Sequence, residues 1–226
     1  MIRFFKYIRN YFKKIRFVKI QKIKLSEKGT LLNAFKEKKL IFIHIPKTAG
    51  ISLVKAFFGE VTLEGHRSLW FYKQVFKSDF KEYFTFTIVR NPWDRLYSAY
   101  KFLEKGGMNI HDKNAFETHL SIYRDFEDFV LNGLNKKITL EIMHLIPQHE
   151  FVCDKNGKII VDHIGRFENL NKSIEKINDI LKSEFELDHH NKNDKKDYKD
   201  TYTAKMIEKV HQVYQKDIDI FQYKFS

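Results

Sequence analysis

The segment LIFIHIPKTAGISL, residues 40–53, decides the fold because its character changes in the middle. Its first part is apolar and rich in β-branched residues, which is typical of a short buried strand over residues 40–45. Pro46 opens a polar loop, and the apolar residues that follow predict a helix over residues 51–58. A loop that joins a strand to a helix presents unpaired N–H groups at the positive end of the helix dipole. The segment therefore predicts an anion-binding loop.

The residue types in this loop indicate a phosphate or another tetrahedral oxyanion. Lys47 supplies a positive charge, Thr48 and Ser52 supply hydroxyl donors, and Gly50 lets the backbone approach a ligand closely. The order differs from the nucleoside triphosphate loop G-x-x-x-x-G-K-[ST], because the lysine precedes the glycine and no magnesium-binding Ser or Thr follows it. An ordinary ATPase is therefore disfavoured. The alternative is a surface lysine at a helix start with no ligand.

A second strand–loop–helix unit follows the first. YFTFTIV, residues 83–89, is aromatic and β-branched and predicts a strand. In the next helix Asn91 can cap the start, Pro92 suits the first helical position, and the Gly106–Gly107 pair ends it. Two such units imply a parallel sheet covered by helices, in which ligands gather at the carboxyl ends of the strands.

The second loop adds basic and hydroxyl groups to this edge. Arg90 follows the predicted strand directly, where a guanidinium can hold a phosphate with two parallel hydrogen bonds. Ser98 lies two turns into the helix and can donate to the same group. Asp94 and Arg95 are interpreted as a structural pair on that helix.

The rest of the chain completes one α/β domain. A hairpin is expected over residues 150–165, with Asn156–Gly157 as its turn. Further helical structure is expected beyond Asn114 as far as residue 134, and over residues 169–181 and 203–217. We expect a P-loop-like three-layer fold over residues 26–226, with a central parallel sheet flanked by helices and a β-hairpin insertion.

Residues 1–25 are expected to form a separate basic amphipathic helix at the N-terminus. They carry nine of the excess positive charges in a chain of formal net charge +12, and they contain no acid. On a helical wheel one face is apolar and the other basic, which is typical of a helix lying in an anionic membrane interface. The apolar face contains Phe4, Phe5, Tyr7, Ile8, Tyr11, Phe12, Ile15 and Val18. The alternative is a helix packed on its own domain.

Composition excludes several other classes. No apolar run approaches the length of a membrane span, and residues 1–24 lack the uninterrupted apolar region of a secretory signal peptide. Nucleic acid is not expected as a partner, because the aromatic residues form one stripe instead of alternating with the charges. The single cysteine, Cys153, fits a reducing compartment. We expect a cytoplasmic protein, which would be peripheral at the inner face of the membrane if residues 1–24 bind lipid.

Five segments resemble a known family in the family's order. IPKTAGIS and FTIVRNPWDRLYSAY resemble the two signature segments of the PAPS-dependent carbohydrate sulfotransferases, where PAPS is 3′-phosphoadenosine 5′-phosphosulfate. The others are EGHRS, IPQHEFVCDKNGKIIVDHIGRFENLN and VYQKDIDIFQYKF. The resemblance covers the chain from about Leu40 to its end and implies transfer of a sulfuryl group from PAPS to a hydroxyl of a carbohydrate or glycoconjugate, with PAP as the product.

Carried over residue by residue, the resemblance implies two cofactor-binding groups. The 5′-phosphosulfate would be wrapped by Lys47, Thr48, Ala49, Gly50, Ile51 and Ser52. Arg90 and Ser98 would bind the 3′-phosphate. Ile51 replaces the usual threonine and keeps only its backbone N–H. Asn191 and Lys192 are expected near the cofactor, although Asn193 stands where the family more often has serine.

The resemblance also implies the catalytic groups. His66 matches the family's catalytic histidine and would act as general base, since a histidine pKa lies near neutrality. Lys47 would stabilise the leaving phosphate. His44 is interpreted as a strand residue inside the sheet. His189 and His190 flank an acidic residue, but no metal-ligand spacing emerges, and we expect no metal.

Two other classes remain open. A P-loop-type phosphotransferase, such as a kinase, predicts a magnesium carboxylate near the phosphate loop, and neither signature supplies an obvious one. A non-catalytic membrane-surface adaptor would depend on residues 1–24 and gives no reason for the two signature segments.

Overall fold

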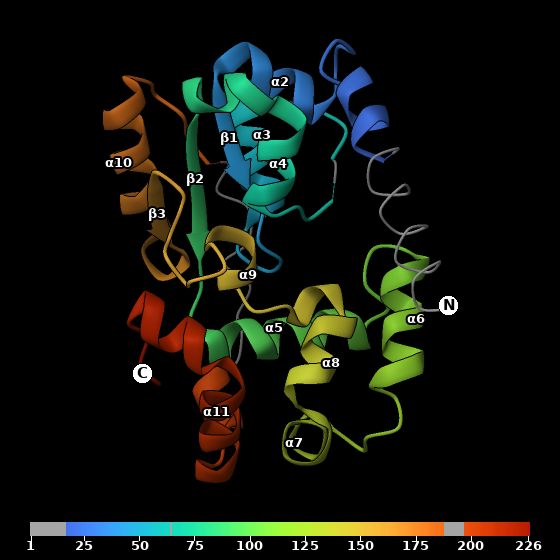
Figure 1. Ribbon diagram of the computed structural model, residues 1–226. Helices are drawn as coiled ribbons and strands as arrows, with labels where there is room; N and C mark the ends of the chain where they lie inside the picture. The colour runs from blue at the N-terminus through green and yellow to red at the C-terminus, as the bar shows by residue number, and fades with distance from the viewer. Residues whose placement is uncertain (1–16, 64, 188–196) are drawn as a thin grey trace.

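The fold is described from a computed structural model that places residues 17–63, 65–187 and 197–226 (Figure 1). Most of the predicted amphipathic helix, residues 1–16, lies outside the described residues. So do Asn191, Lys192 and the two neighbouring histidines, His189 and His190.

Three strands form one parallel sheet in the order β1-β2-β3. Their bounds are β1 Leu40–Ile43, β2 Phe84–Val89 and β3 His163–Arg166. All four residues of β1 are buried, as expected for a strand covered on both faces. The register pairs Phe42 with Phe86, whose rings stack at 5.0 Å between centroids. The predicted parallel sheet is confirmed.

Helices cover the sheet and fill the region beyond its carboxyl ends. Around the sheet lie α2 Leu31–Lys38, α3 Gly50–Phe58, α4 Leu69–Phe76 and α10 Leu170–Leu181, with the 3-10 turns Lys77–Glu82 and Phe167–Asn169 (Figure 1). Below the strand ends in the same view lie α5 Pro92–Glu104, α6 Ile110–His119, α7 Phe126–Asp128, α8 Lys136–Glu141, α9 His149–Val152 and α11 Ala204–Phe221. A π-helical turn Phe129–Gly133 and the 3-10 turns Met143–Leu145 and Tyr198–Thr201 connect them.

The two predicted strand–loop–helix units form as their capping residues indicate. The Asn91 side chain accepts a hydrogen bond from the Trp93 N–H, and Pro92 occupies the first helical position of α5. Gly106 follows the end of α5 with φ of 90°, a value that favours glycine. Both loops therefore lie at the carboxyl ends of neighbouring strands.

The expected hairpin is much smaller than its sequence pattern suggested. A turn is present, with Gly157 at φ 81°, but only one antiparallel bridge joins Cys153 to Ile159. The preceding arm is the short helix α9, and the following arm continues into β3, which pairs in parallel with β2. Long-range pairing with β2 therefore replaces most of the local antiparallel pairing.

The described end of the N-terminal segment is a helix over residues 17–23 that packs on the domain. Phe17 contacts Phe71 of α4 at 5.9 Å between ring centroids, Val18 packs against the core, and Gln21 is buried. Among the described residues, no helix has both the length and the apolar character needed to cross a membrane.

Candidate active site

The loop after β1 has an unusual backbone. Lys47 and Ala49 adopt φ of 69° and 63°, in the left-handed region that non-glycine residues rarely occupy. Ala49 is the N-cap of α3 and has no side chain that could cap the helix. The first N–H groups of α3 therefore lack both intrahelical and side-chain acceptors, which leaves them able to bind an anion.

Thr48 has a structural role inside this loop. Its side chain is fully buried, and its hydroxyl donates to the Ile45 carbonyl at 2.9 Å. This bond holds the turn closed. The hydroxyl that the loop exposes is that of Ser52, which lies on the first turn of α3 at the wall of the cavity described below.

Packing against His44 requires glycine at position 50. A Cβ atom at this position would lie 1.8 Å from Cδ2 and Nε2 of the His44 ring. His44 was expected inside the sheet, but it lies just beyond the end of β1, where it is buried and stacks on Phe42. The His44 imidazole thus packs directly against the loop after β1, at the start of α3.

His66 lies beside the His44 ring in a defined orientation. Its Nδ1 is 2.9 Å from the His44 carbonyl oxygen, and because a carbonyl only accepts, Nδ1 must carry the proton. In the neutral ring Nε2 then keeps its lone pair. Burial lowers the pKa of His66 below its ordinary value. The neutral, proton-accepting form is therefore the one present near neutral pH.

His66 and Lys47 face one cavity of about 170 Å3. Its walls are formed by His44, Lys47, Ala49, Gly50, Ile51, Ser52, His66, Phe102, Met108 and His144. The Lys47 ammonium lies 3.9 Å from the centroid of the Phe102 ring, a cation–π contact. Every residue predicted from Lys47 to Ser52, except the buried Thr48, lines this cavity.

Arg90 connects the two loops. Its Nε and one terminal nitrogen donate to the Asp94 carboxylate at 2.7 Å each, and the other terminal nitrogen donates to the Lys47 carbonyl at 2.9 Å. The Arg90 side chain is held against the Phe167 ring at 4.1 Å. Ser98 is half-buried on α5 and is not among the residues that line the cavity.

The interpretation of Asp94 and Arg95 as a pair was wrong. Asp94 pairs with Arg90, while Arg95 points into the core and donates to the carbonyls of His144 and Ile146. Arg90 and Asp94 are four residues apart, and so they meet where the strand end turns into α5.

Two residues that hold Arg90 were not found by sequence reasoning. The Gln148 side chain accepts from the Arg90 N–H and donates to the Arg90 carbonyl, at 2.9 and 2.8 Å. The buried carboxylate of Asp217 on α11 in turn holds Gln148, because it accepts a hydrogen bond from the Gln148 backbone N–H at 2.7 Å. The Asp217 carboxylate also accepts from the backbone N–H of His149. These contacts link positions far apart in the sequence.

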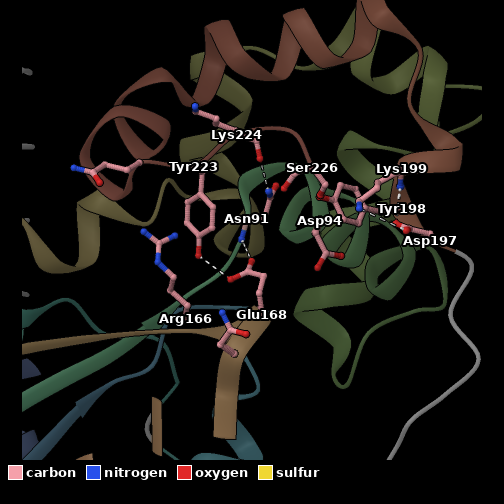
Figure 2. Close-up of a pocket in the computed structure, with 12 residues that line it drawn as sticks. Asn91, Asp94, Arg166, Glu168, Asp197, Tyr198, Lys199, Tyr223, Lys224 and Ser226 are labelled. Atoms are coloured by element: carbon pink, nitrogen blue, oxygen red, sulfur yellow. Dashed lines mark hydrogen bonds and ion pairs between the residues drawn. The ribbon is translucent and has the colours of Figure 1, made fainter. Parts of the chain in front are cut away.

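A second cavity, of about 600 Å3, is lined by Asp94, by Asp197, Tyr198 and Lys199, and by the residues that follow α11 (Figure 2). Glu168 stands at its centre in the close-up and accepts from the Asn91 N–H and from the Tyr223 hydroxyl. Three cationic side chains also line it: Arg166, Lys199 and Lys224. The carboxylate that holds Arg90 thus borders a cavity lined by both acidic and basic side chains.

The arrangement can bind an oxyanion and remove a proton beside it. The uncapped start of α3 and Lys47 provide positive potential, and Nε2 of His66 provides a base at the same cavity. Within the described residues, no group of three or more His, Cys, Asp or Glu side chains is close enough to hold a metal ion.

Comparison with known families agrees with this geometry. Residues 32–224 match the sulfotransferase family, and the chain therefore belongs to that family. Its activity is that of a transferase of the sulfotransferase type. No curated protein and no solved structure matches the chain significantly.

Proposed function

We propose that this protein transfers the sulfuryl group of PAPS to a hydroxyl group of a carbohydrate or glycoconjugate. The observation that carries the proposal is that Nε2 of His66 and the Lys47 ammonium serve one cavity at the uncapped start of α3. Sulfuryl transfer to an alcohol needs a base for the acceptor hydroxyl and positive charge for the leaving phosphate, and this cavity offers both.

In the proposed reaction, the chain chiefly positions groups and stabilises charge. His66 accepts the hydroxyl proton at Nε2 while the acceptor oxygen bonds to sulfur. The bond between sulfur and the bridging phosphate oxygen breaks, and the electron pair stays on the phosphate. Lys47 and the N–H groups of residues 50–52 stabilise that charge, so that PAP leaves and a sulfate ester remains. These groups take the place that magnesium has in many phosphoryl transferases, and we propose no metal.

The same proposal assigns the 3′-phosphate to Arg90 and Ser98. The hydrogen bond from Arg90 to the Lys47 carbonyl supports it, because one nucleotide could then reach both loops. Arg90 has five N–H donors and uses three of them in the contacts above. Two donors therefore remain for an oxyanion. Asn191 and Lys192 stay part of the proposed cofactor site on the family resemblance.

A nucleotide panel tests this function against the phosphotransferase alternative. We expect 3′,5′-ADP to raise the melting temperature without magnesium, and ATP with magnesium to raise it little, since ligand binding stabilises by RT ln(1 + [L]/Kd). The opposite pattern would favour a phosphotransferase, and no response to either nucleotide would favour the adaptor. Screening sugars, glycolipids and oligosaccharides with labelled PAPS would then identify the acceptor.

We also propose that the N-terminal segment docks the enzyme on an anionic membrane at the cytoplasmic face, where lipid-linked glycans would be within reach. In the described helix of residues 17–23, Ile20 and Ile23 are 46% and 68% exposed, beside Lys19 and Lys22. Apolar residues next to basic ones suit a surface of anionic lipids.

A matched pair of variants tests membrane docking. Because Phe17 and Gln21 pack on the domain, the truncation should remove only residues 1–16. This truncation combined with Ile20→Ser should reduce sedimentation with anionic vesicles, while Ile122→Ser, which changes another exposed isoleucine, should not. Equal sedimentation of all three proteins at low salt would show that the segment only packs on its domain.

A further inference from the structure

The cavity contains a second imidazole that the proposed reaction does not use. His144, in the 3-10 turn Met143–Leu145, lines the same cavity as the residues of the loop after β1 and lies 5.7 Å from His66 between ring centroids. Its Nδ1 is 3.7 Å from Oδ1 of Asp112. Sequence reasoning missed both residues. The one sequence signal for His144 was its place just before the matched segment 146–171.

Burial, hydrogen bonds and packing fix the position of Asp112. It is the single buried residue of α6, with 8% of its surface exposed. Its other oxygen, Oδ2, accepts from the Met108 N–H and from the Asn109 side chain at 3.0 Å each. Gly107, at φ 65°, lies so close that a Cβ atom there would be 2.1 Å from the Asp112 Cβ. Oδ1 is thereby directed toward His144.

His144 is held from its backbone as well. Arg95 donates to its carbonyl at 3.2 Å, and the Phe102 ring packs on the imidazole at 4.9 Å between centroids. A carboxylate beside Nδ1 favours the proton on Nδ1, so Nε2 is the nitrogen left for the cavity. Burial outweighs the attraction of Asp112 and lowers the pKa of His144 to about 4. The neutral ring can accept a hydrogen bond at Nε2.

The cavity therefore presents two imidazoles in the same state. His66 carries its proton on Nδ1 because of the His44 carbonyl, and the Asp112 carboxylate, 3.7 Å from Nδ1 of His144, favours the same tautomer in His144. Each offers an Nε2 lone pair to a hydroxyl group. Phe102 and Met108 form an apolar wall beside them, which suits the C–H face of a hydroxylated ring.

We infer that the acceptor carries two hydroxyl groups on neighbouring ring carbons, of which His66 deprotonates one and His144 accepts a hydrogen bond from the other. The inference rests on the proposed function and narrows its substrate class to vicinal diols. His144 is then a specificity-determining residue, and Asp112 positions it.

Binding of two small probes tests the inference. Affinities of trans-1,2-cyclohexanediol and cyclohexanol are measured by NMR on the full-length protein saturated with 3′,5′-ADP. We expect the diol to bind about twofold to tenfold more tightly, the worth of one net hydrogen bond. In His144→Leu the ratio of the diol affinity to the cyclohexanol affinity should fall to about one. His119→Gln, which changes a histidine near Glu141 outside the cavity, should keep the wild-type ratio.

A spectroscopic measurement on the wild type keeps the test independent of the variants' folding. With ¹⁵N-labelled histidine, the diol should shift Nε2 of both His66 and His144, and cyclohexanol should shift Nε2 of His66 alone. Equal affinities for the two probes, no response of His144 to the diol, or a ratio that persists in His144→Leu would overturn the inference. Because 3′,5′-ADP binding is measured first, its absence would instead refute the proposed function.

Discussion

Replacement of Gly50 by alanine tests the packing that links the phosphate loop to the histidines. The new Cβ would lie 1.8 Å from the His44 ring, where an ordinary contact begins near 3.4 Å. The His44 ring cannot retreat freely, because it stacks on Phe42 at 5.8 Å and meets His66 at 4.2 Å. The loop or the ring must therefore shift, and the shift would reach His66.

The expected loss of stability follows from adding an atom to a packed interior. Forcing an extra methyl group into a packed interior costs about 1 to 3 kcal/mol. A gain of up to about 1 kcal/mol offsets it, because alanine favours the helix more than glycine does. We expect Gly50→Ala to lose about 1 to 2 kcal/mol of unfolding free energy, and each kcal/mol lowers Tm by about 2 to 4 °C in a domain of this size.

A double-mutant cycle measures the coupling between Gly50 and His44 in the free energy of unfolding. Urea unfolding gives the free energies of Gly50→Ala, His44→Ala and the double variant. Since removal of the His44 ring makes room for the new Cβ, the loss in the double variant should be smaller than the sum of the single losses by at least about 1 kcal/mol. Ser52→Ala, on the same turn of α3, adds no atom and should leave stability nearly unchanged.

Additive losses would refute this reasoning. They would mean that the His44 ring and the Gly50 backbone do not contact each other as the structure shows. Loss of 3′,5′-ADP binding in Gly50→Ala, together with recovery in the double variant, would further show that His44 supports the loop in its binding conformation.

Three other predictions concern the site itself. Lys47→Ala and Arg90→Ala should each weaken 3′,5′-ADP binding by about 1.5 to 3 kcal/mol in calorimetry, because each removes a charge-assisted contact. Arg90→Ala also leaves the Asp94 carboxylate unpaired, and the double variant Arg90→Ala with Asp94→Ala measures that separate effect. His66→Ala should keep 3′,5′-ADP affinity and reduce turnover by about 10²- to 10⁴-fold, and a variant with most of its turnover would show that another group is the base. In the wild type, kcat/KM should be constant near pH 7 and fall only as pH drops through the lowered pKa of His66, below the ordinary histidine value of about 6.5; a fall already above that value would contradict a neutral base.

Local sequence signals predicted much of the fold. The strand at residues 40–43, the helix after it and the capped start of α5 all formed, because each depends on residues within one turn or one strand. The α10 helix appeared over Leu170–Leu181, as its 3.6-residue period indicated. The same signals placed the residues from Lys47 to Ser52 at one junction between a loop and a helix, and the family resemblance added His66.

The hairpin shows where local signals fail. Asn156–Gly157 marks a turn correctly, but the apolar residues around it had two possible partners. In the folded chain the later arm pairs in parallel with β2, where Phe86 lies opposite His163. A turn dipeptide contains no information about that competition, because it is decided by pairing and burial against β2, which lies far earlier in the chain.

The sequence by itself determined where an anion-binding loop and a candidate base would form, because short-range patterns specify strand ends, helix starts and caps. The tertiary structure alone decided that Asp94 holds Arg90, that Gln148 and Asp217 fix the Arg90 backbone, and that His144 shares a cavity with His66. These contacts depend on which segments the core brings together. Hydrogen bonds and charges act over a few ångströms in space, whereas Gln148 and Asp217, for example, are 69 positions apart along the chain.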